Sequence, residues 1–478
     1  MSKNVTLDPE NWDEFKKLGH KMLEDALTHL QNIRELPTEV NPEGIKKLTT
    51  PLTEDGEGAE QVYNILQENF IPYDISITRP QSWGFVNGTG SPYGVLVDML
   101  VSSKNSGMGL FGDVPIWLQS LSWIKELLEI PQDYGGTYVS GGSEANFTGI
   151  AVARNSKAAI NMKTKGVQNV QNKMVLYGSE EIHHCLERSV ELLGLGNEAI
   201  RWIPVDENYS IKIDELEKKI KEDRKNGFHP FCVIGCAGTV NTGAFDDLNG
   251  LADLCQKEDM WFHVDGAFGA WIKLSETHKQ LADGLERADS IAVDLHKWMN
   301  MPYTVGVTLV KDKLAQFSTF VYGHDAMYLD SAVSDQQLDM LTLMSSLGLS
   351  RPNLGLRTYM LLRANGKKKY RNLIQQNIDD IAYLGEKLEK DEQFELTAPV
   401  ISNIVCFRYV PKKLSEEKME ELNRNILAEL WKTRWGIISD TTIKGKYMLR
   451  ACNVNHRTKR EDFDYLITEI KNIGAELV

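Results

Sequence analysis

Between about residues 110 and 310, short apolar runs alternate with amphipathic helical stretches. The runs are apolar at consecutive positions, so both faces of the corresponding strands must be covered by other elements. The stretches between them, such as "IDELEKKIKEDRKNG", are long enough to cross over between parallel strands. This pattern predicts an α/β fold with a mainly parallel central sheet covered by helices. The runs read "KMVLYGS", "FCVIGCAGT", "WFHVDGA", "SIAVDLH" and "VGVTLVKD".

The chain has 478 residues, which is too long for one simple core, so we expect more than one structural unit. Residues 11–35 carry apolar side chains at three- and four-residue steps, which indicates an amphipathic helix. Near the C-terminus, the runs "SNIVCFRYV" and "KYMLRACNV" alternate with charged helical stretches. We therefore expect an N-terminal helical segment over residues 1–95, a large domain over 96–365 and a small α/β domain over 366–478.

The composition of the chain limits the kinds of molecule that the protein is expected to bind. A net charge of −14 argues against nucleic acid and anionic membranes as partners, because the protein's field repels phosphates. The first residues lack a basic region followed by an apolar one, and no window approaches the roughly 20 apolar residues of a membrane span. The six cysteines show no zinc-like spacing, so reduced thiols and no metal site are expected. We expect a cytoplasmic protein that binds a small molecule.

Polar residues follow four of the apolar runs. His183, Thr239 and Asp265 each come shortly after a run, and His296 and Lys297 stand side by side after "SIAVDL". In an open parallel sheet, ligands bind beyond the carboxyl ends of the strands. Because these residues follow four different strands, the fold can bring them to one site.

The stretch "YVSGGSEANFTGIAVAR", residues 138–154, combines a Gly-Gly-Ser turn with a helical run. A helix that begins here presents free backbone N–H groups and the Ser143 hydroxyl, and its dipole favours an anion. An acidic protein needs such a local trap to bind a phosphate. A plain helix cap is the alternative interpretation.

Together, a phosphate trap, an aspartate, a histidine and a lysine that follows a buried run match the requirements of pyridoxal phosphate. The lysine amine condenses with the aldehyde of this cofactor, and burial is expected to lower the pKa of Lys297 so that the neutral amine is available. An aspartate, here Asp265, pairs with the pyridine nitrogen and keeps the ring an electron sink.

Three stretches, "HVDGAFGAW", "ADSIAVDLHKWMN" and "SGGSEANF", resemble the group II pyridoxal-phosphate-dependent amino-acid decarboxylases. This family includes the aromatic L-amino-acid and glutamate decarboxylases. The resemblance continues over nearly the whole chain, to "LRACNVNHRT". It implies an aspartate-aminotransferase-like fold (fold type I), pyridoxal 5'-phosphate as cofactor, an amino-acid substrate and a homodimer.

The resemblance also implies roles for individual residues around the cofactor. Lys297 would hold the cofactor, Asp265 would bind its ring nitrogen, and Ala267 would leave room beneath the ring. His183 matches the histidine that stacks on the other face of the ring. The phosphate would be bound by Gly142 and Ser143, and Thr239 and His296 would line the site.

Four further residues are implied for the substrate and the reaction. Arg450 corresponds to an arginine that receives the α-carboxylate. Tyr328, in "HDAMYLD", corresponds to a loop tyrosine that helps to protonate the carbanion after carbon dioxide leaves. Trp83 and Phe85 are expected at the substrate entrance and slightly favour an aromatic substrate, although a place in the core or in a dimer interface is the alternative.

The sequence departs from the family pattern at "DVPIW" and at "TRPQSW", which contains Arg79. Both stretches are expected to line or support the substrate entrance, so acidic and diamino substrates remain alternatives to an aromatic one. A second hypothesis is an aldehyde-lyase or an oxidative aldehyde synthase with the same fold. A third is a catalytically inactive relative that serves as a binding or scaffold subunit. Lys297, Asp265 and His183 are all present, which favours an enzyme; family members that oxidise the amine tend to lack Tyr328 or His183.

Overall fold

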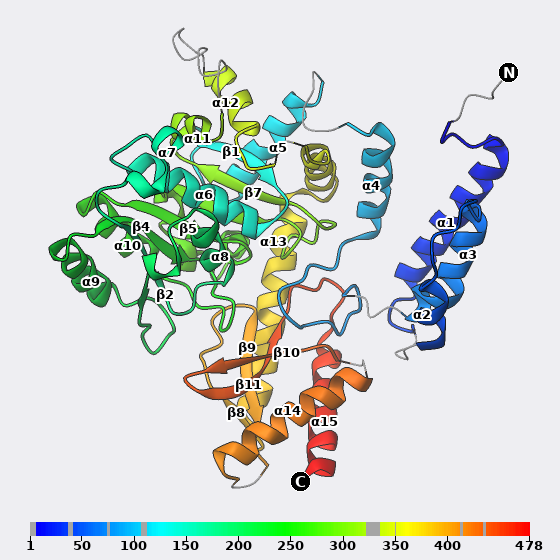
Figure 1. Ribbon diagram of the computed structural model, residues 1–478. Coiled ribbons are helices and arrows are strands. Elements are labelled where there is room, and N and C mark those ends of the chain that lie inside the picture. The colour runs from blue at the N-terminus through cyan, green and yellow to red at the C-terminus, as the bar shows by residue number, and fades with distance from the viewer. Residues whose placement is uncertain are drawn as a thin grey trace.

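The computed structural model describes residues 6–36, 42–73, 77–106, 112–321, 335–348, 350–411, 414–433 and 436–478. Two sheets organise these ranges, a seven-stranded sheet and, nearer the C-terminus, a four-stranded sheet (Figure 1). No helix within the described ranges is long and apolar enough to cross a membrane.

The seven-stranded sheet has the strand order β1-β7-β6-β5-β4-β2-β3. The five strands β6, β5, β4, β2 and β3, which are neighbours in this order, are all parallel. Strand β7 is antiparallel to both of its neighbours, β1 and β6. The mainly parallel sheet predicted from the sequence is therefore confirmed. Its strands are β1 (Gly135–Val139), β2 (Met174–Ser179), β3 (Ile200–Ile203), β4 (His229–Cys236), β5 (Trp261–Asp265), β6 (Ser290–Asp294) and β7 (Gly306–Val310).

Helices cover both faces of this sheet, which explains why its strands are apolar at consecutive positions. In β2, Met174 and Leu176 pack in one cluster with residues of α6 and α8. Val175 and Tyr177 face the other side and pack with residues of α9 and α10. The helices of this domain are α5 (Val114–Leu127), α6 (Gly142–Lys157), α7 (Met162–Lys165), α8 (Cys185–Leu192), α9 (Ile213–Lys225), α10 (Leu248–Lys257), α11 (Lys313–Phe320) and α12 (Asp335–Leu343).

The four-stranded sheet is antiparallel, in the order β10-β11-β9-β8, and has its own apolar core with α14 (Glu416–Thr433) and α15 (Arg460–Leu477). The long α13 (Leu354–Glu389) joins the two sheets (Figure 1) and is interrupted at Gly366, where φ is 70°. The predicted boundary at residue 365 lies beside this interruption and stays a prediction. The strands are β8 (Phe394–Leu396), β9 (Ile404–Tyr409), β10 (Ser439–Ile443) and β11 (Lys446–Cys452).

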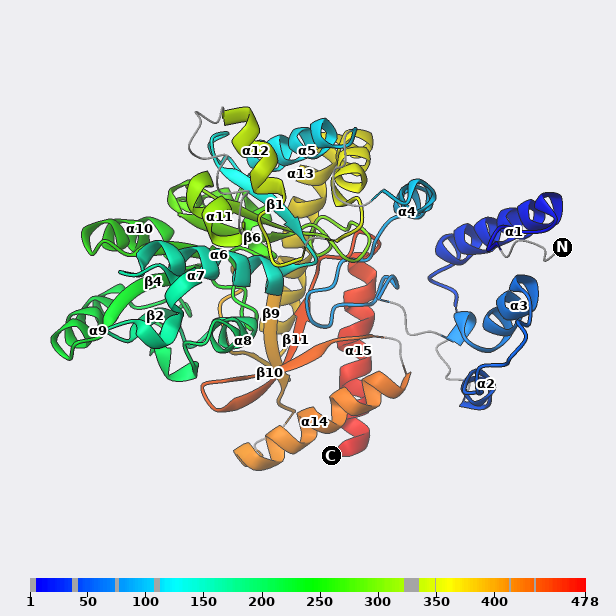
Figure 2. The same cartoon turned by 45° about the horizontal axis from the view of Figure 1, so that its top comes forward.

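The N-terminal helices α1 (Trp12–Gln31), α2 (Pro42–Leu48) and α3 (Ala59–Asn69) lie apart from both sheets, as Figures 1 and 2 show from two directions. The helix predicted within residues 11–35 is present as α1, but none of its residues is buried. An ion pair of 2.8 Å between Arg34 and Asp462 connects this segment to the start of α15. The chain then enters the large domain through α4 (Pro92–Lys104).

Candidate active site

A cavity of about 520 Å³ lies at the carboxyl ends of β4, β5 and β6, and residues of the small domain form part of its wall. This volume falls within the range of small-molecule sites. The cavity brings together ten of the twelve residues that the sequence suggested. They are Phe85, Gly142, Ser143, His183, Thr239, Asp265, Ala267, His296, Lys297 and Arg450.

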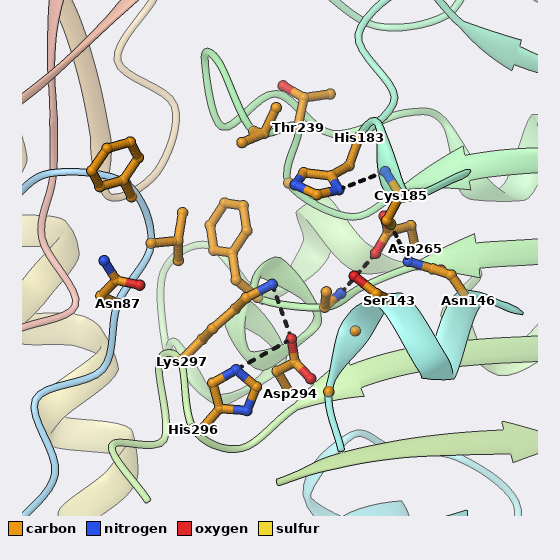
Figure 3. Close-up of a pocket in the computed structure, with 18 of the residues that line it drawn as sticks. Asn87, Ser143, Asn146, His183, Cys185, Thr239, Asp265, Asp294, His296 and Lys297 are labelled. Atoms are coloured by element: carbon orange, nitrogen blue, oxygen red, sulfur yellow. Dashed lines mark hydrogen bonds and ion pairs between the residues drawn. The ribbon is translucent and has the colours of Figure 1, made fainter. Parts of the chain in front are cut away.

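Lys297 follows β6, and its Nζ forms an ion pair of 2.9 Å with Asp294, three residues earlier (Figure 3). Burial alone would lower the pKa of Lys297, but the nearby charges of Asp294 and Asp265 outweigh burial and raise it. The prediction of a lowered lysine pKa is therefore wrong for the protein without cofactor, because it considered burial without the carboxylate of Asp294.

Asp265 ends β5 and is largely buried, with its Oδ1 accepting a hydrogen bond of 3.1 Å from the backbone N–H of Ala267. The ring of His183 faces the same cavity (Figure 3), and its Nδ1 accepts a hydrogen bond of 3.1 Å from the backbone N–H of Cys185. The neutral ring must therefore carry its proton on Nε2. Burial lowers the pKa of His183, so the ring is neutral at pH 7.

The N-terminus of α6 is built for an anion. The N-cap residue is Gly141, and no side chain among the described residues caps the 16-residue helix, so the plain cap considered above is not found there. A Cβ atom on Gly142 would lie 2.8 Å from Asp294 Oδ2 and 3.0 Å from the Cβ of Ala267, so only glycine fits. The first turn, with Ser143, thus presents free N–H groups to the cavity.

Thr239 and His296 complete the part of the wall formed by the large domain. The hydroxyl of Thr239 accepts a hydrogen bond of 3.1 Å from the backbone N–H of Ala244. The His296 ring packs 4.5 Å from the ring of Tyr303, measured between centroids, and burial lowers its pKa. Both side chains are thereby fixed at the edge of the cavity.

Arg450, on β11, reaches the cavity from the small domain. Its side chain is only 3% exposed, its Nε donates to the carbonyl of Asn241 at 3.0 Å, and its Nη1 donates to the carbonyl of Phe85 at 3.0 Å. Among the described residues, no hydrogen-bond acceptor meets its buried Nη2. A guanidinium group with an unsatisfied donor at a cavity is suited to receive a carboxylate.

Trp83 does not lie where the sequence analysis expected it. Its side chain is 0% exposed, packs 4.7 Å from the ring of Phe463, and donates from Nε1 to Thr458 Oγ1 at 3.0 Å. The expected place at the substrate entrance is wrong, and Trp83 belongs to the core of the small domain. Phe85 lies at the cavity, and its backbone is left-handed, with φ of 57°.

The other expectations for the entrance have mixed outcomes. Tyr328 lies outside the described residues. Trp117, from "DVPIW", is fully buried and donates to Asn353 Oδ1 at 2.6 Å, and Arg79 donates to the carbonyl of Leu36 at 2.7 Å. Neither residue is in the cavity wall, so these departures from the family pattern lie behind the site.

The cavity wall also contains residues that the sequence analysis missed. Asp294 stands in a quoted run, and its spacing of three residues from Lys297 could have drawn attention to it. Glu181 accepts a hydrogen bond of 2.9 Å from Asn241, and burial raises its pKa. Tyr303 donates a hydrogen bond to Asn87 Oδ1 at 3.0 Å. The two residues are far apart in the sequence, so no local sequence pattern predicts this contact.

Comparison with known proteins agrees with this geometry. The family described as "Pyridoxal-dependent decarboxylase conserved domain" matches residues 42–410. An aromatic-L-amino-acid decarboxylase of Bacillus atrophaeus is 31% identical and covers 100% of this chain and 98% of its own length. The chain belongs to the pyridoxal-dependent decarboxylase family. It is a pyridoxal-phosphate-dependent amino-acid decarboxylase, and pyridoxal 5'-phosphate is its cofactor.

More distant relatives differ in substrate and in reaction. Phenylacetaldehyde synthase of Arabidopsis thaliana is 25% identical over 93% of this chain and 92% of its own, and an acidic amino acid decarboxylase of Bos taurus is 27% identical over 96% and 92%. The crystal structure of Oryza sativa TDC with PLP and tryptamine is 21% identical, has a TM-score of 0.88 and covers 99% of this chain and 100% of its own. This likeness confirms the fold type I architecture of the decarboxylase.

The different positions of Trp83 and Phe85 lead to a test of stability. Trp83→Ala should lower the free energy of unfolding by about 3 to 5 kcal/mol, because it leaves a cavity in a packed core. Phe85→Ala is the matched control: this side chain is 55% exposed, and its loss should change stability by less than about 0.5 kcal/mol. Urea unfolding followed by circular dichroism measures both, and equal losses would contradict the assignment of Trp83 to the core.

Proposed function

We propose that the enzyme decarboxylates an aromatic L-amino acid to the corresponding amine and carbon dioxide. The observation that carries the proposal is the unsatisfied Nη2 of Arg450, which shares one cavity with Lys297. The aromatic side chains of Phe85, Phe268 and Tyr303 in the same wall support an aromatic substrate. The relative of 31% identity, named for aromatic amino acids, supports it as well.

We assign the following roles in cofactor binding to the residues of the cavity. Gly142 and Ser143 would bind the phosphate of the cofactor, Lys297 would bond covalently to its aldehyde carbon, and Asp265 would keep its ring nitrogen protonated. The bound cofactor supplies an electron sink for the charge that forms at the α-carbon. His183, Thr239, Ala267 and His296 would hold the ring in place.

Arg450 would orient the substrate. It binds the α-carboxylate through Nη2, while its other donors stay on Asn241 and Phe85 and keep the guanidinium group in place. Arg450 is only 3% exposed, and the low effective dielectric around a buried guanidinium group strengthens this charge pair. Tyr328 would then supply a proton to the α-carbon.

A screen for amine products tests the proposed substrate class. Purified enzyme with pyridoxal phosphate is incubated with each of the twenty amino acids, DOPA and 2,4-diaminobutyrate, and amines are identified by mass spectrometry alongside headspace carbon dioxide. We expect aromatic amines to form in clear excess over all others, because Phe85, Phe268 and Tyr303 in the wall offer aromatic contacts to such a side chain. Amines formed only from acidic or diamino substrates would contradict the proposal.

Oxidation of the amine to an aldehyde is the second candidate, because a relative of similar length is a phenylacetaldehyde synthase. Tyr328→Phe separates the two reactions by removing only the hydroxyl. If Tyr328 donates the proton, the variant should release less amine and more aldehyde, ammonia and peroxide in air, because the longer-lived carbanion meets dissolved oxygen. The product ratio under air and under nitrogen is measured, with Tyr465→Phe as control, because Tyr465 is 44% exposed and lies outside the cavity wall. Unaltered amine output would assign the protonation to another group.

We also infer that the enzyme is a homodimer in which α1 packs against the partner. Trp12, Phe15 and Met22 lie on one face of α1 and are 55%, 47% and 45% exposed. Such an apolar stripe, on a segment set apart from the rest of the chain, indicates that another surface covers it. A cytoplasmic location stays a prediction.

Light scattering tests the dimer. The wild-type enzyme should have the mass of two chains at micromolar concentration, and the double variant Phe15→Glu with Met22→Glu should dissociate, because it places charges in the apolar interface. Lys17→Glu introduces the same side chain at another exposed position of α1 and should remain a dimer. A wild-type enzyme that is an active monomer would refute the inference.

A further inference from the structure

Asp294 is a buried carboxylate to which the proposed reaction assigns no role. It ends β6, is 1% exposed, and its Oδ2 lies 2.9 Å from Lys297 Nζ and 3.8 Å from His296 Nε2 (Figure 3). No backbone N–H within the described ranges donates to either of its oxygens. The Lys297 ammonium group is thus the main compensation for this buried charge.

The same carboxylate lies against the turn that begins α6. A Cβ atom on Gly142 would come within 2.8 Å of Oδ2, and one on Gly306 within 2.8 Å of Oδ1. The N-terminus of α6 favours a negative charge, and Asp294 already places one there. A phosphate bound by Gly142 and Ser143 would have this like charge as its neighbour.

We propose that Asp294 is a positioning residue that holds free Lys297 as an ammonium ion beside the phosphate-binding turn, and that this ion pair restrains capture of the cofactor. The inference rests on the cofactor-binding roles proposed for Lys297, Gly142 and Ser143. In the covalent step, Nζ bonds to the aldehyde carbon and two of its hydrogens leave with the aldehyde oxygen as water. The third hydrogen, the ammonium proton, must first pass to Asp294 or to water.

The charges around Lys297 determine whether removing the Asp294 carboxylate raises or lowers the pKa of Lys297. Asp294 and Asp265 raise the pKa of Lys297 against burial. Without the Asp294 charge, burial would act with less opposition and the lysine pKa would fall, so more neutral amine would be present at any pH below that pKa. The like charge beside the phosphate would also disappear.

The other titratable groups that face Lys297 and Asp294 do not ionise in the range from about pH 7 to about pH 9.5, where the second proton of a phosphate is already lost. Burial lowers the pKa of His183 and His296 below their ordinary value, so both are neutral in this range. Burial raises the pKa of Cys185 to about 12, of Tyr303 to about 12 and of Cys452 to about 11. Asp265 is the remaining charged neighbour. Ionisation of pyridoxal phosphate itself is common to every protein tested, so the difference between the wild-type and variant pH profiles in this range reports on Lys297.

The test compares the cofactor-free wild-type enzyme with Asp294→Asn. Each is mixed with pyridoxal phosphate, and the rate at which the visible absorbance of covalently bound cofactor appears is measured from about pH 7 to about pH 9.5. The wild-type rate should rise with pH over the whole range. The profile of the variant should move to lower pH by about one unit or more, which makes capture about tenfold faster at neutral pH.

A second probe isolates the phosphate effect. Pyridoxine 5'-phosphate has no aldehyde and cannot bond covalently to Lys297, so its equilibrium binding reports on the non-covalent contacts, which include those at the phosphate-binding turn. Asp294→Asn should bind it about tenfold more tightly, because a like charge has been removed. A residue that served only to stabilise the fold would weaken both forms of binding when replaced.

Asp289→Asn is the matched control. Asp289 precedes the opposite end of the same strand, and its Oδ2 accepts a hydrogen bond of 2.8 Å from the backbone N–H of Phe262, which an asparagine can also accept. This variant should match the wild type with both probes. Borohydride reduction followed by peptide mapping should place the covalent label on Lys297 in all three proteins, and a label on Lys273 or Lys311 would overturn the proposed site together with this inference.

With the label on Lys297, an unchanged pH profile or weaker binding of pyridoxine 5'-phosphate in Asp294→Asn overturns the inference alone. The wild-type profile provides a test that does not depend on folding of the variant. A wild-type capture rate that levels off below about pH 9, after correction for the ionisation of pyridoxal phosphate itself, would mean that Lys297 loses its proton more easily than ordinary lysine, and the inference would be wrong.

Discussion

The active site depends on one constraint. The carboxyl ends of β4, β5 and β6 and the start of α6 lie at the same edge of the large sheet. The strands β4, β5 and β6 run in the same direction, so the residues after them, Thr239, Asp265 and Lys297, leave the sheet at the same edge. The start of α6 joins them because α6 packs on the face of this sheet. A single topological fact thus places an acid, an amine and an anion trap within one cavity.

Charge compensation inside that cavity is the second constraint. Asp294 and Lys297 are three residues apart, at the end of a buried strand, and the buried charge of Asp294 would be costly without the partly exposed Lys297. Removing one partner of a fully buried pair costs about 3 to 5 kcal/mol in known proteins, which is an upper bound for the loss of Lys297 here. The amine needed for chemistry is therefore also needed, before the cofactor arrives, to keep the strand end stable.

Much of the fold could be read from the sequence because its signal is local. Runs such as "VIGC" and "FHV" are apolar at consecutive positions, which only a sheet covered on both faces satisfies, and the polar residues after them marked the site. The position of Trp83 could not be read in this way. Trp83 lies in the core and Phe85 at the cavity, and Phe85 has a left-handed backbone conformation. Such a conformation is uncommon in residues other than glycine and cannot be predicted from the sequence here. The lysine pKa failed for a related reason, because its sign depends on a distance between side chains and not on burial alone.

The small domain supplies what the large sheet lacks. Among the described residues, Lys297 is the cation that the large domain contributes to the cavity wall, and it pairs with Asp294 on the cofactor side, so a substrate carboxylate needs a separate donor. Arg450 provides it from β11, and its position depends on the carbonyls of Asn241, in the large domain, and Phe85, in the segment before α4. The donor is therefore in place only when three parts of the chain are packed together. The Nη1 atom of Arg450 also donates to the hydroxyl of Ser439 at 3.2 Å, and Ser439 lies directly opposite Arg450 on β10. The pairing of β10 with β11 is therefore a further condition for placing the carboxylate donor at the cavity.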